Sequence, residues 1–315
     1  MASREPARES SPSSLSGEPP FEPVGLNRPA LVGRSPLKVA LLNVAGGREI
    51  RAIADRLSRP PLSDAGSIML CEASWRMPRH GLVEAASTLA EALKMSFAFL
   101  PSFGRPEDVG NYRATGNALL SAQPIEDFFA VPLAKPPHLV QPRRVIGVHQ
   151  GLIATLAHGG RRFRIGVVHL ERLWDPAGRA QQMEDFLAAI GRDLPAIIGG
   201  DLNTTTLNMD RRLELPRACL AVAIRPRRFR YPERHEPLFE SISTHGFSIE
   251  GANVRGAPTF TMGGIVPRLW RPKLDWIAAR GLNPVSGTAA VVPARNSLLG
   301  RRLSDHEFVT CEFRF

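Results

Sequence analysis

Cysteine is scarce in this chain. Its 315 residues include only Cys71, Cys219 and Cys311, which lie far apart and form no C-x-x-C pair. A disulfide framework normally uses an even number of cysteines, and a zinc site uses closely spaced ones. Neither is indicated, and we expect the thiols to be reduced and structural.

Long apolar runs are missing as well. No run approaches the roughly 18 apolar residues of a transmembrane helix. Residues 9–20, which follow Arg4 and Arg8, contain no apolar stretch of the signal-peptide kind. These absences predict a soluble, cytoplasmic protein without a transmembrane segment, and we also expect it to be a monomer.

Lysine is the third scarce residue. The chain has 40 Lys and Arg against 30 Asp and Glu, a formal charge of +10, yet only four of the basic residues are lysines. A coding bias toward arginine explains this preference as well as function does. The functional explanation is that a guanidinium grips phosphate through two parallel hydrogen bonds, so the charge suggests an anionic partner or substrate.

The remaining composition is that of a globular protein, with 43% hydrophobic and 22% charged residues. Residues 1–35 differ because they are rich in Pro, Ser, Glu and Arg, and we expect them to form a disordered tail. Four arginines and four glutamates cancel within this tail. The positive charge therefore belongs to residues 36–315, which we expect to form one domain.

Short apolar runs of strand length follow from Lys38 onward. Strands are expected over Val39–Asn43, Ser67–Glu72, Gly116–Leu120, Val145–His149, Arg164–His169, Ala196–Gly200, Leu274–Ala278 and Glu307–Phe313. Apolar residues at helical spacing predict helices over Leu82–Met95 and Ala177–Ile190. Strands in which nearly every residue is apolar have neither face exposed to solvent. We therefore expect an α/β fold in which sheets pack together and helices cover them.

Four polar residues stand where an apolar run stops. They are Asn43, Glu72, His169 and Asp201. Taken singly, such residues are usually helix caps, turn residues or satisfied core histidines. Strand ends that share a sheet edge converge on one pocket, which is where α/β proteins place chemistry. The sequence therefore predicts that these side chains meet.

Asp275 is a carboxylate within an apolar run, L-D-W-I-A. A buried carboxylate needs a hydrogen-bonded or charged partner, and His306 of S-D-H, just before the last expected strand, is the candidate. An Asp that orients a His and stabilises its protonated form is a recurring means of holding charge in a transition state. We expect Asp275 and His306 to be in contact.

The order of the motifs is more specific than any one of them. The chain reads L-L-N-V-A-G-G at 41–47, M-L-C-E at 69–72, G-N-A-L-L-S at 116–121, V-V-H-L at 167–170, G-G-D-L-N-T at 199–204, K-L-D-W-I at 273–277 and L-S-D-H at 303–306. This series resembles the endonuclease/exonuclease/phosphatase superfamily, which includes DNase I, neutral sphingomyelinases, inositol polyphosphate 5-phosphatases and exonuclease III-type AP endonucleases. The resemblance implies a four-layered α/β sandwich, with two packed, mainly antiparallel or mixed β-sheets flanked by helices.

The resemblance also implies a metal site. Glu72 matches the ligand of the catalytic divalent ion, usually Mg²⁺ with Mn²⁺ as a substitute. Asn43 matches a residue beside it, and Asp305 matches a second metal-side or histidine-orienting carboxylate. A hard cation held by carboxylate oxygens suits Mg²⁺, which acts as a Lewis acid and a template. We therefore expect a Mg²⁺-dependent phosphoesterase.

Other residues match groups that act on the phosphoester itself. Asp201 and Asn203 resemble the pair that positions the attacking water, with Asp201 as the base. His306 resembles the histidine that hydrogen-bonds a phosphoryl oxygen, oriented by Asp275, and His169 the histidine near the scissile phosphate. A protonated histidine places positive charge where negative charge accumulates. No covalent nucleophile is indicated, so direct attack by water is expected.

The positions at which this sequence departs from the family pattern indicate which branch of the superfamily it resembles. Exonuclease III-type enzymes usually read Q-E-x-K at the metal Glu and follow G-D-x-N with V or I and then A, whereas this chain reads C-E-A-S and T-T-T. The chain looks more like the bacterial group near DNase I and the sphingomyelinases. Asn117 of G-N-A-L-L-S is a candidate substrate-binding residue, although the Arg that commonly follows in relatives is absent.

Arginines concentrate in residues 211–234. This segment holds eight arginines against two glutamates, a net charge of +6, with Phe229 and Tyr231 among them. Arginines interleaved with aromatic rings suit a nucleic-acid backbone. A lipid-bound anionic substrate and a solvated basic loop are the alternatives. The candidate substrate-binding residues in the segment are Arg225, Arg227, Arg228 and Arg230.

A nuclease-like phosphodiesterase is the favoured function, with a phosphoester, nucleic acid in particular, as its partner. One alternative is a sphingomyelinase-like or inositol-phosphate-type phosphohydrolase. Another is a non-catalytic protein on the same fold that binds nucleic acid or an anionic membrane surface. Arg179 and Gln182 match a helix opening common in the family and are expected to be structural. Histidines without a surrounding motif, His149 among them, are expected to be structural or surface residues.

Overall fold

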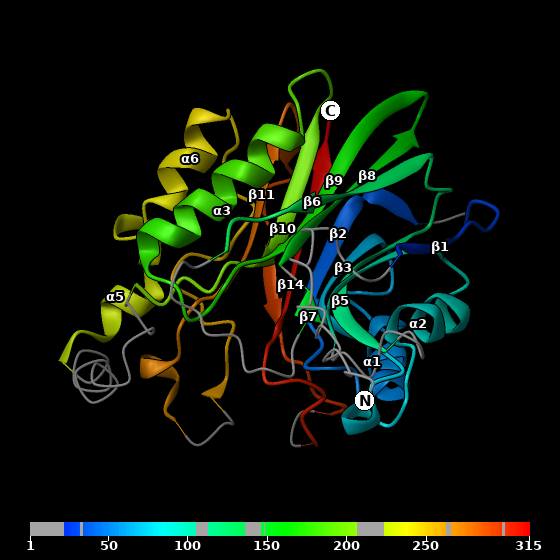
Figure 1. Cartoon of the computed structure of the whole chain (residues 1–315), viewed down its shortest axis with the longest axis horizontal. Coiled ribbons are helices and arrows are strands. Elements are labelled where there is room, and N and C mark those ends of the chain that lie inside the picture. Colours follow the sequence, from blue (N-terminus) through cyan, green and yellow to red (C-terminus); the bar gives the residue numbers. More distant parts are fainter. Residues whose placement is uncertain are drawn as a thin grey trace, which may run out of the picture.

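Two β-sheets pack face to face in the middle of the molecule, with helices on the outer face of each (Figure 1). This arrangement is seen in a computed structural model, which describes residues 22–31, 34–104, 113–135, 146–147, 149–206, 224–262, 266–297 and 300–315. The four layers confirm the α/β sandwich expected from the sequence.

The first sheet has nine strands. Their order is β1-β4-β5-β3-β2-β14-β12, with β13 paired to β14 and β7 paired to β4. β2 and β3 run parallel, and the other pairs are antiparallel. The bounds are β1 Val24–Leu26, β2 Ser35–Asn43, β3 Ala65–Trp75, β4 Ser96–Gly104, β5 Ala114–Ser121, β7 Ile146–Gly147, β12 Asn283–Pro284, β13 Ala290–Val292 and β14 Phe308–Arg314.

The second sheet has five strands, in the order β11-β10-β9-β8-β6. β9 and β10 run parallel, and the other pairs are antiparallel. The bounds are β6 Asp127–Pro132, β8 Gln150–His158, β9 Arg161–His169, β10 Ala196–Asp201 and β11 Asp275–Arg280. Each sheet therefore contains one parallel pair, and these two pairs carry the predicted site residues Asn43, Glu72, His169 and Asp201.

Alternation along the strands explains why the runs are so apolar. Successive side chains of a strand point to opposite faces of the sheet. In β2, Ala40 packs in the cluster under the outer helices, whereas Val39 packs between the sheets. In β10, Ile198 faces the other outer helices and Ile197 faces the first sheet. Neither face meets water, so polar residues are concentrated where these strands end.

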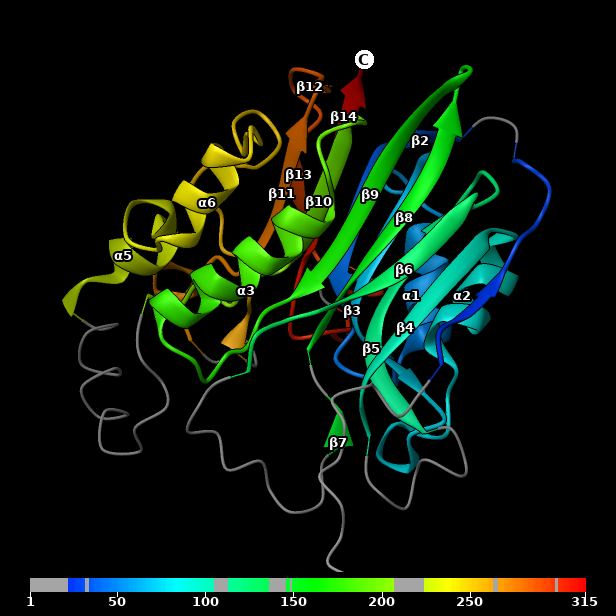
Figure 2. The ribbon, with the colours of Figure 1, turned by 45° about the horizontal axis from the view of Figure 1, so that its top comes forward.

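Four helices cover the sheets. α1 (Ile50–Leu57) and α2 (Ala85–Leu93) pack on the first sheet, and α3 (Pro176–Ala189) and α6 (Leu238–Thr244) on the second. Figure 2 shows the two pairs on opposite sides of the sheets. The helices expected over 82–95 and 177–190 are confirmed as α2 and α3. None of the helices in the described ranges is long and apolar enough to span a membrane.

One predicted strand is confirmed only in part. A strand was expected over Val145–His149, but β7 comprises only Ile146 and Gly147, and the long strand β8 begins at Gln150. Gly147 has a φ of +106°, which interrupts an extended backbone. Val145 and Val148 lie outside the described residues. The other seven predicted strands are confirmed as β2, β3, β5, β9, β10, β11 and β14.

The first sheet extends into the segment expected to be a tail. β1 pairs with β4. The amide of Asn27 donates to the carbonyl of Ile125 at 2.9 Å and accepts from its backbone N–H at 2.8 Å. Val24–Leu26 therefore belong to the fold, upstream of the expected boundary at residue 36. Residues 1–21 of the expected tail lie outside the described residues.

Candidate active site

Both parallel strand pairs lead to the same site. Asn43, the last residue of β2, is paired with Cys71 within β3, and at the ends of β9 and β10, His169 is paired with Asp201. β11 runs antiparallel to β10 and begins at this end, so that Asp275 is paired with Asp201. Residues paired across neighbouring strands project from the same face of a sheet. The register thus places His169, Asp201 and Asp275 side by side.

Asn43 links the two sheets. Its Nδ2 donates to Oε1 of Glu72 at 3.1 Å and to Oδ2 of Asp201 at 3.0 Å. Its Oδ1 accepts from the backbone N–H of Ala45 at 3.0 Å, which fixes the orientation of the amide. Its backbone carbonyl accepts from the hydroxyl of Ser304 at 2.5 Å. The predicted convergence of Asn43, Glu72 and Asp201 is therefore confirmed.

Gly200 lets β10 bring Asp201 close to β9. A Cβ at position 200 would lie 1.6 Å from the carbonyl oxygen of Val168 on β9. No side chain fits there without separating the two strands. The glycine before Asp201 is therefore required by the close approach of two parallel strands.

Glu72 occupies a β-bulge. The register between β3 and β5 shifts between Leu70 and Ala73, and Glu72 has a φ of +54°. Such a backbone conformation costs a non-glycine residue about 1–3 kcal/mol, and strain of this kind is concentrated at functional sites. The Glu72 side chain is 42% exposed, whereas the preceding Cys71 is buried. The bulge thus presents a carboxylate at the surface of an otherwise buried strand.

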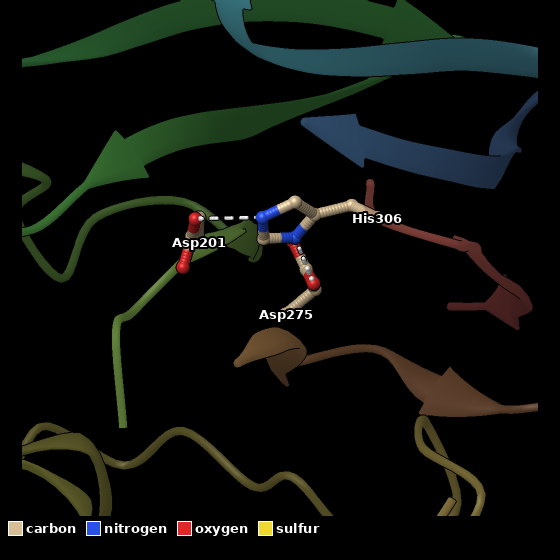
Figure 3. A group of neighbouring side chains, drawn as sticks. All are labelled: Asp201, Asp275 and His306. Carbon is tan, nitrogen blue, oxygen red and sulfur yellow. Dashed lines mark hydrogen bonds and ion pairs between the residues drawn. The ribbon is translucent and has the colours of Figure 1, made fainter. Parts of the chain in front are cut away.

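His306 lies between two buried carboxylates (Figure 3). Its Nδ1 is 2.8 Å from Oδ2 of Asp275, and its Nε2 is 3.6 Å from Oδ2 of Asp201. The predicted contact between Asp275 and His306 is confirmed. Burial by itself lowers the pKa of His306, but the negative charges of Asp275 and Asp201 raise it to about 10. The imidazole is therefore a buried cation at neutral pH.

The two carboxylates differ in their pKa. Burial raises the pKa of Asp275 above its ordinary value, although His306 opposes this shift. Burial acts on Asp201 in the same direction, but His306 and His169, together with the hydrogen bond from Asn43, bring its pKa below the ordinary value. Asp201 is therefore the more acidic of the two carboxylates.

His169 and Asn203 surround Asp201 on the second sheet. The Nε2 of His169 is 3.7 Å from Oδ2 of Asp201 and 4.0 Å from Oε1 of Glu72, and its side chain is 17% exposed. The backbone N–H of Asn203 donates to Oδ1 of Asp201 at 3.0 Å. The Asn203 amide donates to the carbonyl of Leu170 at 2.8 Å. Asn203 therefore orients the carboxylate of Asp201 through its main chain.

Two sets of side chains offer ligand atoms for a cation. Those of Asp201, Asp275 and His306 lie within 4.8 Å of one another, but a protonated imidazole has no lone pair to give a metal. Glu72 presents an exposed carboxylate beside the Asn43 amide. Oxygen donors that solvent can reach suit a hard, hydrated divalent ion. The residues present fit such an ion better at Glu72 than at His306.

Asp305 and Asn117 lie in different settings. The Asp305 side chain is exposed and accepts from the Ser304 hydroxyl at 3.5 Å. Asn117 is buried in β5, where its amide donates to the carbonyl of Gln150 at 2.7 Å. Within the described residues, no hydrogen bond joins Asn117 to Asp201 or its neighbours.

The arginine segment divides into two kinds of residue. Arg228 donates to the side chain and the backbone carbonyl of Thr206, each at 2.9 Å, and Arg230 donates to a backbone carbonyl at 2.8 Å. Arg228 thus supports the segment after G-D-L-N, and Arg230 is tied to Gly256. Arg225 and Arg227, at the start of α5 (Pro226–Arg230), are exposed. Residues 207–223, which include three of the eight arginines, lie outside the described residues.

A buried ion pair supports the same loop. Arg179 of α3, expected to be structural, is fully buried, and its Nη2 is 2.6 Å from Oε1 of Glu236. That oxygen also accepts from the backbone N–H of Thr206 at 2.6 Å. The carbonyl of Trp174 accepts from the Nη1 of Arg179. The pair therefore ties α3 to the loop that follows Asp201 and Asn203.

One polar pair beside His169 has no sequence motif of its own. The Nε2 of His149 is 2.9 Å from Oε2 of Glu171, and both side chains are largely buried. His149 was expected to be a structural or surface residue. The one signal in the sequence is the acidic residue two positions after His169, in H-L-E.

The model of the Endonuclease/Exonuclease/phosphatase family matches residues 40–306. The chain belongs to this family. The matched range begins within β2 and ends at His306, so it includes all the residues that come together at the site. Membership of the family supports a phosphoester hydrolase. No curated protein sequence matches the chain significantly.

Several solved structures share the fold at low sequence identity. An endonuclease/exonuclease/phosphatase from Beutenbergia cavernae is 17% identical, with 88% of this chain and 71% of that one covered and a TM-score of 0.59. D. rerio TDP2, solved with a single-strand DNA product, is 17% identical over 88% and 98% of the chains, with a TM-score of 0.54. Sphingomyelinase C from Streptomyces griseocarneus is 16% identical over 87% and 98%, with a TM-score of 0.50. At these identities the likeness concerns the fold alone.

Proposed function

We propose that this family member is a divalent-metal-dependent phosphodiesterase of the nuclease type, which hydrolyses a P–O bond by direct attack of water. The observation that carries the proposal is the His306 imidazole between the Asp275 and Asp201 carboxylates, at 2.8 and 3.6 Å. A phosphodiester is anionic, so attack on it needs positive charge where the phosphoryl oxygens gain negative charge. A buried imidazolium supplies that charge at a fixed position.

Asp201 is the candidate base. Its carboxylate is buried, ionised and held by hydrogen bonds from the Asn43 amide and the Asn203 backbone. A carboxylate fixed in this way orients a water molecule and accepts its proton without first having to rotate. Asp275 holds Nδ1 of His306, which leaves Nε2 directed to the Asp201 side. His169 supplies a second imidazole next to Asp201.

Glu72 is the proposed anchor of the metal. With Asn43 beside it and Asp305 as a further carboxylate, Glu72 would hold a divalent cation, Mg²⁺ or its substitute Mn²⁺. When bound, the ion supplies Lewis-acid stabilisation of charge on the phosphoryl group. The β-bulge at Glu72 serves this purpose, because a regular strand would direct residue 72 into the apolar packing that its neighbours make.

Arg225 and Arg227 favour nucleic acid as the substrate. They are exposed at the start of α5, the first helix that follows Asp201 in the described part of the chain. Arginines at such a position can contact backbone phosphates beyond the scissile one. The structural likeness to TDP2, which was solved with a single-strand DNA product, supports this substrate class. The likeness to sphingomyelinase C makes a lipid phosphodiester the alternative to be tested.

A screen of phosphoesters tests the substrate class. It covers bis-p-nitrophenyl phosphate, single- and double-stranded DNA, RNA, sphingomyelin and inositol phosphates, each with Mg²⁺, Mn²⁺ or EDTA. We expect metal-dependent turnover of bis-p-nitrophenyl phosphate and of DNA. Turnover confined to sphingomyelin in liposomes would replace the nuclease by a lipid phosphodiesterase. Salt-sensitive DNA binding without turnover of any phosphoester would contradict an enzyme.

Glu72→Gln should raise the Mg²⁺ concentration that gives half-maximal rate by about 10- to 100-fold, because the amide keeps the shape but loses the charge that attracts the ion. Initial rates on bis-p-nitrophenyl phosphate across a Mg²⁺ series measure this shift. Glu91→Gln removes an exposed carboxylate of α2 and is the matched control. If Glu72→Gln shows the same Mg²⁺ dependence as wild type, Glu72 does not anchor the ion. The ion would then have to bind on the Asp201 side of the site.

Replacing Arg225 and Arg227 together by glutamine should raise KM for plasmid DNA and leave kcat unchanged, because these side chains would contact phosphates that do not react. The salt dependence of KM should also become shallower by about one unit of slope per lost phosphate contact. Arg51 and Arg59, exposed arginines at and after α1 on the opposite side of the molecule, are the matched control pair (Figure 1). A loss in kcat alone would contradict this placement.

A further inference from the structure

His149 and Glu171 form a buried polar pair outside the group that contacts Asp201. The His149 Nε2 is 2.9 Å from the Glu171 Oε2, and the two side chains are only 13% and 14% exposed. His149 lies in the connection between β7 and β8, and Glu171 lies just after β9. Two loops that are separate in the chain are therefore joined next to the strand end that carries His169.

Glu171 is held firmly in place. Its Oε1 accepts from the backbone N–H of Leu173 at 2.9 Å. Its own backbone N–H donates to the buried Gln182 side chain of α3 at 2.8 Å. Burial by itself raises the pKa of Glu171, but the hydrogen bond and charge of His149 bring it down to about 2. Glu171 is thus an ionised acceptor with a fixed position.

His149 is in turn packed between two rings. The edge-on ring of Phe103 lies 4.5 Å from the His149 ring, centroid to centroid, with an interplanar angle of 81°. The His169 ring lies 5.6 Å away at an angle of 80°. An imidazole held by a carboxylate and by an aromatic ring has little freedom to rotate. It therefore presents a rigid surface to His169.

The His169 ring has no comparable anchor of its own. Its Nε2 is 3.7 Å from Asp201 and 4.0 Å from Glu72, which is beyond hydrogen-bond distance. In the described part of the chain, no hydrogen bond fixes this ring. Burial lowers the pKa of His149, so the pair is a buried hydrogen bond from an imidazole to a carboxylate, and a buried carboxylate is a poor source of stability compared with apolar side chains of the same volume. The position of the pair against His169 therefore indicates a purpose other than stability.

We propose that His149 and Glu171 act as positioning residues, which hold the imidazole of His169 toward Asp201 and Glu72. This inference rests on the proposed phosphodiesterase function, in which His169 lies near the scissile phosphate. A catalytic group that is misplaced by about 1 Å can lose as much as 10²-fold in rate. The pair should therefore affect kcat and leave KM for a small substrate nearly unchanged.

Four variants test the pair with bis-p-nitrophenyl phosphate at saturating Mg²⁺. His149→Leu and Glu171→Ala should each lower kcat by about 10- to 100-fold. Glu171→Gln, whose amide oxygen can still accept from His149 although its NH₂ group cannot accept from the Leu173 backbone N–H, should lose less rate than Glu171→Ala. His149→Phe keeps the edge-on ring without the hydrogen bond, so its kcat should lie between wild type and His149→Leu. Thermal unfolding shows whether each variant is folded.

Repeating the His149→Leu substitution in the His169→Gln variant distinguishes an effect on the position of His169 from a general loss of structure. If His149 acts through His169, then His149→Leu should cost nothing further once His169 is replaced. The same fold-loss in both backgrounds, a rise in KM in place of a fall in kcat, or an unchanged kcat in His149→Leu would each overturn the proposal. If the wild-type protein hydrolyses any phosphodiester, the proposed function holds, and a negative result for His149 then contradicts only the positioning role.

A spectroscopic measurement gives a result even if no substrate turns over. The Cε1–H signal of His169, assigned with His169→Gln in histidine-labelled protein, reports the surroundings of its ring. His149→Leu should shift or broaden this signal, because the ring gains rotational freedom and loses the ring current of its neighbour. The signal of His158, at the far end of the β8–β9 hairpin, should not move. An unaltered His169 signal would overturn the proposed contact.

Discussion

His306→Ala is expected to lower kcat for a phosphodiester by about 10²- to 10³-fold, because the variant removes a fixed cation from the place where charge develops. Asp201→Asn should lower kcat by about 10²- to 10⁴-fold, because the amide cannot accept a proton from water and retains only one of the two oxygens that accept from Asn43 and Asn203. Rates on bis-p-nitrophenyl phosphate and on plasmid DNA measure both effects.

The double variant should lose little more than the worse single variant, since Asp201 and His306 act on the same reaction step. His158→Gln, at the far end of the β8–β9 hairpin, is the matched control for loss of an imidazole. Wild-type rates in either single variant would contradict the roles proposed for these residues. Circular dichroism and thermal unfolding separate a loss of chemistry from a loss of structure.

Arg179→Met should lower the free energy of unfolding by about 3–5 kcal/mol, the usual effect of removing one partner from a fully buried ion pair. The variant leaves the carboxylate of Glu236 without its cation, and both side chains are inaccessible to solvent. Urea unfolding measures the change. Because the same carboxylate accepts from Thr206, we also expect the loop after Asn203 to exchange its amide hydrogens faster.

The double variant Arg179→Met with Glu236→Leu is the informative control. It replaces the whole pair by apolar side chains, so it should be clearly more stable than Arg179→Met alone. Equal stability of the single and double variants would show that the charge of Glu236 is not what destabilises the protein. Should Arg179→Met fail to fold, Glu236→Gln, which keeps a hydrogen-bond acceptor, provides the same comparison at a smaller cost.

Most of the architecture could be predicted from the sequence because buried strands leave a clear pattern. Neighbouring apolar residues such as Ile197 and Ile198 require that both faces of a strand be covered. That requirement leads to packed sheets between helices. Two of the missed strands have weaker patterns, whereas β8, which begins one residue after the expected strand Val145–His149 ends, was missed although most of its residues are apolar and buried. β4 contains Pro101, next to a shift in its register with β5, and β6 is an edge strand with alternate residues exposed.

The group around His306 could be predicted because each of its members interrupts or ends an apolar run. Asp275 was conspicuous within L-D-W-I-A, and its pairing with Asp201 follows from the register of β10 and β11. His149 follows the run V-I-G-V and Glu171 stands two positions after His169, but neither position indicates that the two side chains meet, because their contact depends on how two loops approach each other. Local patterns predict strands well, whereas loop-to-loop contacts are set by tertiary packing.

Counting charges in the sequence showed where the arginines are concentrated but not which of them are available to a substrate. Eight arginines fall in residues 211–234, yet Arg228 and Arg230 donate to backbone carbonyls within the fold. Only the structure separates these bracing residues from the exposed Arg225 and Arg227. The net charge of a segment therefore overstates the number of cations available to a substrate.

The pairing of β2 with β14 has a consequence for the synthesis of the protein. The Ser304 hydroxyl that binds the Asn43 carbonyl comes from a residue 261 positions further along the chain. Asn43 and Glu72 thus leave the ribosome long before His306, and until β14 is added one side of β2 is an unpaired edge that is open to association with other chains. Hydrolytic competence should therefore arise among the last events of folding, and fragments that stop before β14 should be inactive and prone to aggregate.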